Sequence, residues 1–421
     1  MLQPDTQVIL LLCASFGQNR QTKPQPLTLS EYNSVAGWLR ENNLTPKDLL
    51  TQVCSQKLRE TNFGKVDSER IIALLNRSFM LSLAVEKWTN QGLWILARSD
   101  RHYPKCLKQK LKHSAPAILY GIGNIELLSQ GGLAVVGSRK VDAEGLSYTK
   151  NVVHTCVSEG IQVVSGGAPG VDQAAMLAAL EAGGTAVGVL AGSLSEAAVA
   201  SKFRSRIREN QLTLISPYDP DASFSIGNAM GRNKYVYALA NYALVISSLV
   251  EKGGTWAGAT EALKKMQNTP VFVRMQGDVP EGNYQLIKKQ AKHFPKLPWE
   301  RPLQELLQIA ISEGETEENK RQLETEAIVE PTKVARNNPS EITSPSLPAK
   351  SRPQNIYEAV LPLILEKLEQ PLDDKTLAKL LEVQVGQMRI WLKQAVAEGK
   401  VIKHKQPVTY ELNRYQDLLP L

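Results

Sequence analysis

The sequence predicts an α/β fold in which a doubly wound parallel sheet lies between a helical N-terminal domain and a smaller C-terminal domain. Between residues 133 and 274, short apolar runs alternate with helical patterns. Such runs are typical of parallel strands that are buried on both faces, and these strands are joined by helices that cross over the sheet. With 421 residues, the chain is long enough to form two or three domains.

Residues 1–120 are predicted to form the helical N-terminal domain. Apolar residues recur there at helical spacing, and residues 29–31 have the composition of a helix start. Helices are expected at 29–40, 68–75 and 79–90, followed by a short strand at 93–97. The apolar segment 8–13 is too short to span a bilayer, and it lacks the basic start and the cleavage site of a signal peptide.

Residues 121–300 are predicted to form the sheet domain. Strands are expected at 133–136, 161–165, 185–190, 212–216, 242–248 and 270–274. Helices are expected between them at 143–159, 171–182, 195–210, 232–240 and 256–267, with a loop at 218–230. Ligands of open α/β sheets bind beyond the carboxyl ends of the strands, so we expect the functional site at those ends.

The rest of the chain is predicted to be a linker and a small domain. Residues 301–354 are expected to be a disordered linker, because from about residue 311 they are rich in Glu, Thr, Asn, Ser and Pro. Residues 355–421 contain three helical patterns followed by two short alternating runs, which indicates a winged-helix-like domain. The helices are expected at 355–368, 373–381 and 385–398, and the strands within 400–412.

A glycine-rich turn joins the second predicted strand to a helix that opens at Val171. Its backbone N–H groups, beside the positive end of the helix dipole, are typical of a phosphate site. The spacing G-G-x-x-G differs from the dinucleotide fingerprint, which argues against NAD. Asp172, in the first helical turn, is either a partner of the helix dipole or a residue that fixes the loop. The turn consists of Ser165, Gly166, Gly167, Ala168, Pro169 and Gly170.

Three further strand ends carry candidate phosphate contacts. After the first strand, a glycine permits close approach and the next Ser and Arg can bind phosphate; the alternative is an ordinary turn. Two cations at a predicted helix start oppose the helix dipole, which a bound phosphate would compensate. The last strand end is a second backbone cradle or a turn with a threonine cap. These ends supply Gly137, Ser138, Arg139, Arg232, Asn233, Lys234, Gly253, Gly254 and Thr255.

Composition narrows the classes of function. The formal net charge is +7, which is modest for a chain of this length and is not the charge of a uniformly basic coat. The four cysteines lie far apart and the five histidines form no cluster, so neither a metal centre nor a disulfide framework is predicted. We therefore expect a cytoplasmic protein with no cofactor and no membrane partner.

Four sequence blocks occur in one order: VVGSR, VVSGGAPGVDQAA, MGRNKYVYALA and SSLVEKGGTWAGATEAL. Together with the preceding DRHYP and PAILYG, they resemble the DNA-processing protein A family (DprA, also called Smf) over roughly residues 90–275. The resemblance implies a Rossmann-like domain that binds and protects single-stranded DNA, loads a RecA-type recombinase in DNA uptake, recombination and natural transformation, and often forms homodimers. It also implies a DNA pocket lined by Gly137, Ser138, Arg139, Ser165, Gly166, Gly170, Asp172, Arg232 and Asn233.

The chain departs from the family pattern at three places. The helix after the glycine turn usually carries an Ala-His pair, whereas residues 173–176 read QAAM. The usual Arg-Asn-Arg is Arg-Asn-Lys at 232–234, and the usual Ser-Gly-Ser is Gly-Gly-Thr at 253–255. These departures place the chain in a divergent branch of the family.

Two classes of function stay open. In a binding module, phosphates bind to backbone N–H groups and to Arg139, Arg232 and Lys234, while aromatic rings stack on bases. In an enzyme similar to nucleoside-monophosphate phosphoribohydrolases, Glu261 acts on a ribose; a nucleotide-sensing protein of the same fold is a further alternative. The sequence contains no evident pair of nucleophile and base, which favours the binding module.

Overall fold

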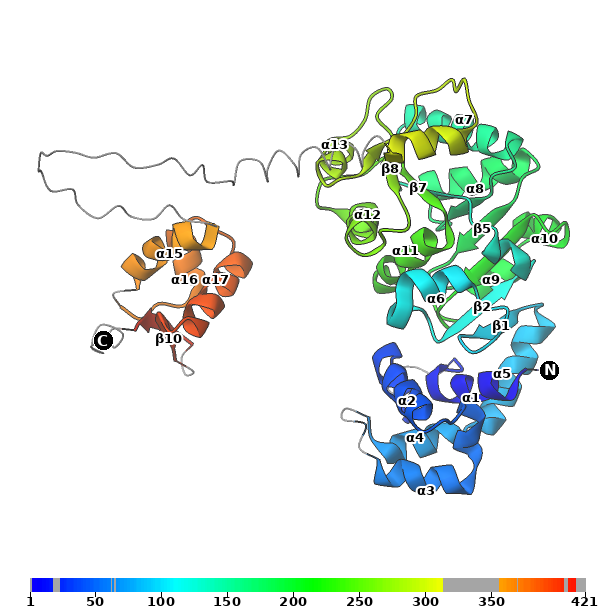
Figure 1. The fold of residues 1–421 in the computed structure, drawn as a ribbon, viewed down its shortest axis with the longest axis horizontal. Coiled ribbons are helices and arrows are strands. Elements are labelled where there is room, and N and C mark those ends of the chain that lie inside the picture. The colour runs from blue at the N-terminus through cyan, green and yellow to red at the C-terminus, as the bar shows by residue number, and fades with distance from the viewer. Residues whose placement is uncertain are drawn as a thin grey trace, which may run out of the picture. The chain divides into compact units, whose positions relative to one another are not determined.

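The computed structural model describes residues 2–17, 23–61, 63, 66–312, 356–368, 370–404 and 408–413. The chain divides into two compact units, Met1–Pro331 and Thr332–Leu421, which Figure 1 colours from blue to yellow and from orange to red. Most of the predicted linker lies outside the described residues, although residues 303–312 are helical.

Helices build the N-terminal part of the first unit. α2 begins with a capping box, in which Thr28 and Glu31 each bind the other's backbone N–H through their side chains. α1 is the buried centre, since its residues 8–12 are at most 3% exposed. The sequence analysis missed α1 because a helix that is apolar on every face shows no periodicity. The elements are α1 (Pro4–Cys13), α2 (Leu29–Glu41), η1 (Pro46–Leu50), α3 (Gln52–Glu60), α4 (Ser68–Leu75) and α5 (Ser78–Asn90).

The described residues of the first unit form a nine-stranded sheet in the order β1-β2-β6-β5-β4-β3-β7-β8-β9. From β6 to β9 all neighbours run parallel. At the other edge, β1 pairs antiparallel with β2, and β2 with β6, so the sheet is mixed and not wholly parallel. The strands are β1 (Trp94–Ala97), β2 (Ile118–Ile122), β3 (Leu133–Val136), β4 (Val163–Ser165), β5 (Ala186–Val189), β6 (Leu212–Ser216), β7 (Tyr242–Val245), β8 (Val271–Val273) and β9 (Lys292–His293).

Four other features differ from the prediction. The predicted domain boundary after residue 120 falls inside β2, a fully buried strand that sequence analysis missed. β9 follows the strand that was expected to be last. The predicted helix 195–210 is divided at Ala200, whose backbone is extended. The predicted loop 218–230 ends early, because Ser225 caps a helix that begins at Ile226 despite two glycines in its first turns.

Helices cover both faces of the sheet. Buried apolar residues of α7 (Ala143–Ser158), α8 (Val171–Glu181) and α9 (Leu194–Val199), with α10 (Ser201–Arg208) beside them, pack in one cluster. Those of α6 (Lys105–Leu111), α11 (Ile226–Leu239), α12 (Gly253–Lys265) and α13 (Glu281–Lys288) pack in a second cluster. The two clusters are the two sides of a doubly wound sheet.

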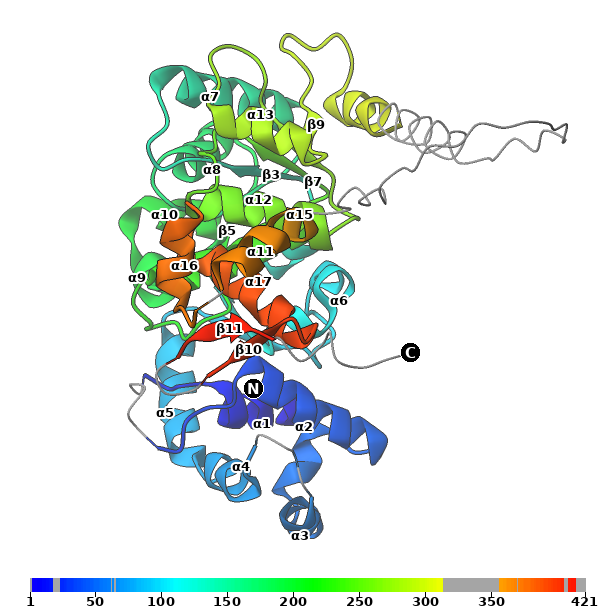
Figure 2. The ribbon, with the colours of Figure 1, turned by 90° about the vertical axis from the view of Figure 1, so that its left-hand side faces the viewer.

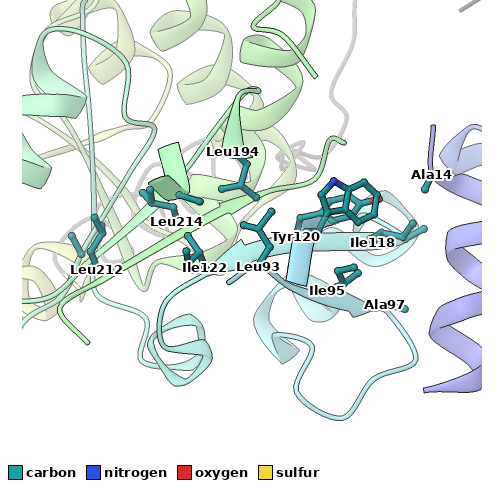
Figure 3. Close-up of a cluster of buried hydrophobic side chains, with 14 of the residues drawn as sticks. Ala14, Leu93, Ile95, Ala97, Ile118, Tyr120, Ile122, Leu194, Leu212 and Leu214 are labelled. Atoms are coloured by element: carbon teal, nitrogen blue, oxygen red, sulfur yellow. The ribbon is translucent and has the colours of Figure 1, made fainter. Parts of the chain in front are cut away.

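The N-terminal helices gather at one end of the first unit, beside β1 and β2 (Figures 1 and 2). Figure 3 shows the buried side chains of this edge, among them Ile95 of β1 and Tyr120 of β2. The ring of Trp88, on α5, lies 5.2 Å from the ring of Tyr120 in an edge-to-face contact. The hydroxyl of Thr6 on α1 donates to Asp100 over 2.7 Å. Asp100 of the DRHYP block is therefore a structural link between helices and sheet.

The second unit contains α15 (Ile356–Lys367), α16 (Asp374–Leu380) and α17 (Val385–Ala397), followed by the antiparallel pair β10 (Val401–Lys403) and β11 (Tyr410–Leu412). Asp373 caps α16 by accepting from two backbone N–H groups. Trp391, Met388 and Leu392 of α17 lie in a core of their own. The winged-helix interpretation of this unit stays a prediction.

Candidate functional site

The topology creates a crevice where β3 and β7 lie side by side. Val136 pairs with Val245 in parallel register, and the chain leaves β3 toward β4 but leaves β7 toward β8, on opposite sides. At such a switch point the two outgoing loops separate. They remain joined at the base, where the Ser138 N–H donates to the Ser247 carbonyl over 2.9 Å. A cavity of about 410 Å³ opens between these loops and α11.

The cavity brings together most of the residues that the sequence analysis singled out. Five predicted residues do not line it, namely Ser165, Gly166, Gly167, Gly170 and Lys234. Sequence reasoning missed several residues that do, including Lys140, Lys252, Ile226, Met230 and Leu249. The predicted residues that line it are Gly137, Ser138, Arg139, Asp172, Arg232, Asn233, Gly253, Gly254 and Thr255.

The glycine turn faces the carboxylate of Asp172, which differs from the open phosphate cradle that the sequence predicts. Asp172 is 7% exposed and reaches back from the first turn of α8. Burial raises the pKa of Asp172 to about 6, although the charge of Arg232 and the backbone amides of Gly137, Ala168 and Gly166 lower it. Amides from the loops after β3 and β4 thus converge on one carboxylate. The arrangement matches the alternative in which Asp172 fixes the loops.

The turn residues outside the cavity hold the two loops close together. The Ser165 hydroxyl is buried and donates to the Val135 carbonyl over 2.6 Å. A Cβ atom on Gly166 would lie 1.5 Å from Nη1 of Arg232, and a Cβ atom on Gly170 would lie 2.5 Å from the Ser138 carbonyl oxygen. Only glycine permits these close approaches. Their structural role is packing beneath the cavity.

Arg232 is the buried cation of the cavity. It lies in the second turn of α11 and not at a helix start, so the argument from the helix dipole was wrong. The side chain is 5% exposed, and Nη1 lies 3.8 Å from Oδ2 of Asp172, which is too far for a hydrogen bond. Within the described part of the chain, Nε has no hydrogen-bond partner. Burial and the nearby charge of Arg139 lower the pKa of Arg232, while Asp172 raises it.

The neighbours of Arg232 have separate roles. Asn233 donates from Nδ2 to the Gly254 carbonyl over 2.9 Å and so ties α11 to the start of α12. Lys234 is half-buried away from the cavity; burial lowers its pKa, and Glu261 raises it. Glu261 forms an ion pair with Lys265 over 2.9 Å on α12 and does not line the cavity.

The N-terminus of α12 opens into the cavity. The helix begins at Gly253, and its N-cap, Lys252, makes no side-chain cap. Thr255 therefore lies inside the first turn. It is not the helix cap that the sequence analysis gave as the alternative to a phosphate cradle. The first backbone N–H groups of a helix are without intrahelical partners and attract anions. This end of α12, rather than the glycine turn, offers open amides to a ligand.

Charge and exposed apolar groups characterise the mouth of the cavity. The lining includes four cationic side chains, Arg139, Lys140, Arg232 and Lys252, against the single carboxylate of Asp172. Around them lie Ile226, Met230 and Leu249, which are 75%, 48% and 57% exposed. The guanidinium of Arg139 stacks over the half-exposed ring of Phe224, 5.2 Å from its centroid. The site can therefore meet an anion and an apolar surface together.

The described residues lack two other kinds of functional feature. They contain no group of three or more side chains suited to hold a metal ion. No described helix combines the length and apolar character that a membrane span requires.

The fold and the cavity define a class, α/β proteins with a parallel-dominated sheet and a cationic crevice at the switch point. Residues 94–298 match the family described as DNA recombination-mediator protein A. Curated relatives include the DNA processing protein DprA of Bacillus subtilis, 26% identical over 182 residues, and protein Smf of Escherichia coli, 26% identical over 240 residues. The central region of the chain is therefore similar to the DprA/Smf family.

The extent of these similarities is limited to part of each chain. The two alignments cover 42% and 56% of this chain and 60% and 62% of the relatives' own length. The X-ray structure of DprA from Streptococcus pneumoniae is similar with a TM-score of 0.53 and 21% identity, over 69% of this chain and 94% of that chain. That likeness concerns the fold, and it agrees with the mixed α/β sheet described above.

Proposed function

We propose that this protein binds single-stranded DNA without sequence preference, with phosphates of the strand in the cavity between the β3 and β7 loops. The single observation that carries the proposal is the state of Arg232. A buried guanidinium whose Nε lacks a hydrogen-bond partner is costly, and native structures normally satisfy such groups. Asp172 offsets its charge, but its Oδ2 lies beyond hydrogen-bond distance of Nη1. A phosphate in the cavity supplies an acceptor for this cation.

The other groups of the cavity favour a polynucleotide as the ligand rather than a small anion. Arg139, Lys140 and Lys252 are exposed at the mouth, where they can follow a backbone past the buried Arg232. The uncapped end of α12 adds backbone N–H groups, which bind phosphate in any sequence context.

The apolar rim supports a single strand over a duplex. In a duplex the faces of the bases are stacked on one another, so exposed aliphatic and aromatic side chains find no apolar surface to cover. In a single strand the base faces are available, and stacking on protein side chains contributes about 1–3 kcal/mol per base. Such contacts can form beside a bound phosphate at Ile226, Met230 and Leu249, which line the cavity, and at Phe224, whose ring lies under Arg139.

Similarity to the family extends the proposal beyond the site. By resemblance, the protein protects the strand and delivers it to a RecA-type recombinase in recombination or DNA uptake, as a cytoplasmic homodimer with a winged-helix-like C-terminal domain. Relatives are named DNA processing proteins, which supports a role in DNA processing. The phosphoribohydrolase alternative is weakened, because Glu261 lies outside the cavity and is engaged with Lys265.

Two lysines on neighbouring elements allow a matched test. Lys252 lines the cavity and Lys234 does not, so Lys252→Ala and Lys234→Ala remove the same charge in and beside the site. Affinity for an unstructured oligonucleotide is measured by fluorescence anisotropy at several salt concentrations, with duplex DNA and mononucleotides as competitors. Lys252→Ala should weaken binding and flatten the slope of log K against log salt by about 0.7 for the lost phosphate contact.

The control variant and the competitors show whether the strand binds in this cavity. Lys234→Ala should keep the wild-type slope, because Lys234 does not line the cavity. Equal slopes for Lys252→Ala and wild type would place the strand elsewhere on the protein. Preference for duplex, or for mononucleotides, would refute the proposed ligand itself.

A further inference from the structure

A second cavity of about 410 Å³ lies beside the first, between α8 and the pair α9–α10. The glycine turn after β4 is the partition between the two. Ala168 lines the first cavity, while its neighbours Gly167 and Pro169 line the second. One residue of extended chain spans only about 3.5 Å, so the second cavity is within reach of a polymer bound in the first.

The walls of the second cavity are apolar. Met176 and Leu177 come from α8, Leu190 follows β5, and Phe203 comes from α10. Met176 is 3% exposed. It stands in the segment 173–176, which departs from the family pattern by having no histidine. These side chains suit the face of a flat, apolar ring.

Hydrogen-bond donors and acceptors also line the second cavity. Gln173 carries an amide that donates and accepts, Glu196 carries a carboxylate that accepts, and Ser193 carries a hydroxyl. The charged side chains of the lining are one acid, Glu196, and one base, Lys202. The ammonium of Lys202 lies 4.8 Å from the centroid of the Phe203 ring. The lining therefore has no excess of cations, and it is not a phosphate site.

An apolar slot with a few convergent polar groups is the usual form of a pocket for a small planar ligand, and its volume is within the usual range of about 300 to 1,000 Å³. A nucleobase has this chemistry, because its faces are apolar and its edge carries donors and acceptors.

We propose that the second cavity receives one unpaired base of the strand whose phosphates occupy the first cavity. The inference rests on the proposed function and assigns the base-binding part of the site to α8 and α10. Phe203 and Leu190 pack against the base, and Gln173 and Glu196 meet its edge. The base belongs to the bound strand and not to a free nucleotide, because the phosphate-binding cations line the neighbouring cavity.

The test compares an oligothymidine with an oligomer of equal length whose central residues are abasic. The wild-type full chain should bind the abasic oligomer about tenfold more weakly, with an unchanged salt slope because the phosphates are the same. Leu177→Trp fills the cavity from a partly buried position. In this variant the ratio should fall severalfold, because only base contacts at the rim around Phe224 still distinguish the two oligomers.

Controls separate the cavity from folding and from the proposed function. Leu83→Trp introduces the same ring on α5, at a residue 53% exposed, and should keep the tenfold ratio. Gln173→Leu, which removes only polar edge contacts, should reduce the ratio and keeps the test valid should Leu177→Trp not fold. Thymidine monophosphate should compete only weakly.

Three results would overturn the inference. Equal binding of both oligomers by wild type would show that no contact to a base contributes to affinity. A tenfold ratio retained in folded Leu177→Trp and Gln173→Leu would move that contact to the rim around Phe224. Strong competition by the mononucleotide would make the ligand a free nucleotide. Loss of the proposed function is distinguishable from all three, since it would appear as no binding of either oligomer.

Discussion

Replacing Asp172 by Asn separates the shape of this side chain from its charge. The amide keeps an oxygen that can accept from the backbone N–H groups of the two loops, but it cannot ionise. In the folded wild type, burial raises the pKa of Asp172 to about 6, while Arg232 and the loop amides act in the opposite direction. The variant therefore tests which influence on the carboxylate is larger.

The sign and size of the effect follow from linkage. Because the folded pKa lies above the ordinary value of 3.8, the folded state holds a proton between about pH 4 and pH 6 that the unfolded chain has lost. Wild-type stability thus falls through this range as pH rises, and the loss is complete above the folded pKa. The two pKa values differ by an amount that corresponds to about 3 kcal/mol. The Asn side chain cannot ionise, so the stability of Asp172→Asn does not show this decrease.

The assay is urea unfolding of wild type and Asp172→Asn at steps from pH 4 to pH 8. The free energy of unfolding of the variant minus that of wild type should rise by about 2.5 kcal/mol over this range, nearly all of it below pH 7. The charge of Arg232 is constant over this range, so it adds only a fixed offset.

Asp221 provides a control, because its pKa is shifted in the opposite direction. Burial raises the pKa of Asp221, but hydrogen bonds from Lys87 and Trp88 outweigh burial, so the net pKa is below its ordinary value. The difference for Asp221→Asn should be flat from pH 5 to pH 8. A flat profile for Asp172→Asn would show that its pKa is ordinary. A profile that falls with pH would show that Arg232 and the amides outweigh burial, and would refute the reasoning.

Two further predictions concern the loops. Gly170→Ala should destabilise the protein by about 2–5 kcal/mol in urea, because its φ is +89° and the new Cβ would meet the Ser138 carbonyl at 2.5 Å. Gly160→Ala, at φ +71° with open space around it, should cost only about 1–2 kcal/mol, and equal costs would contradict the packing argument. Asn233→Ala should lose about 1 kcal/mol of stability and weaken oligonucleotide binding severalfold, since the bond to Gly254 positions α12. Unchanged affinity by anisotropy would limit that bond to stability.

The sequence by itself determined the features that depend on local pattern. Apolar runs alternating with helical periodicity predict the strands β3 to β8 and their crossovers, because a strand buried on both faces must be apolar throughout its length. The site was predictable as a region for a similar reason, since ligands bind beyond the carboxyl ends of such strands. Nine of the predicted residues do line one cavity there, among them Gly137 and Arg232.

Only the tertiary structure decided which groups face one another. The antiparallel direction of β2 depends on pairing with β6, which is almost a hundred residues away in the chain. The turn amides face Asp172, and the lysines that line the cavity are Lys140 and Lys252, not Lys234. These outcomes depend on contacts between distant segments, and neither spacing nor propensity encodes them.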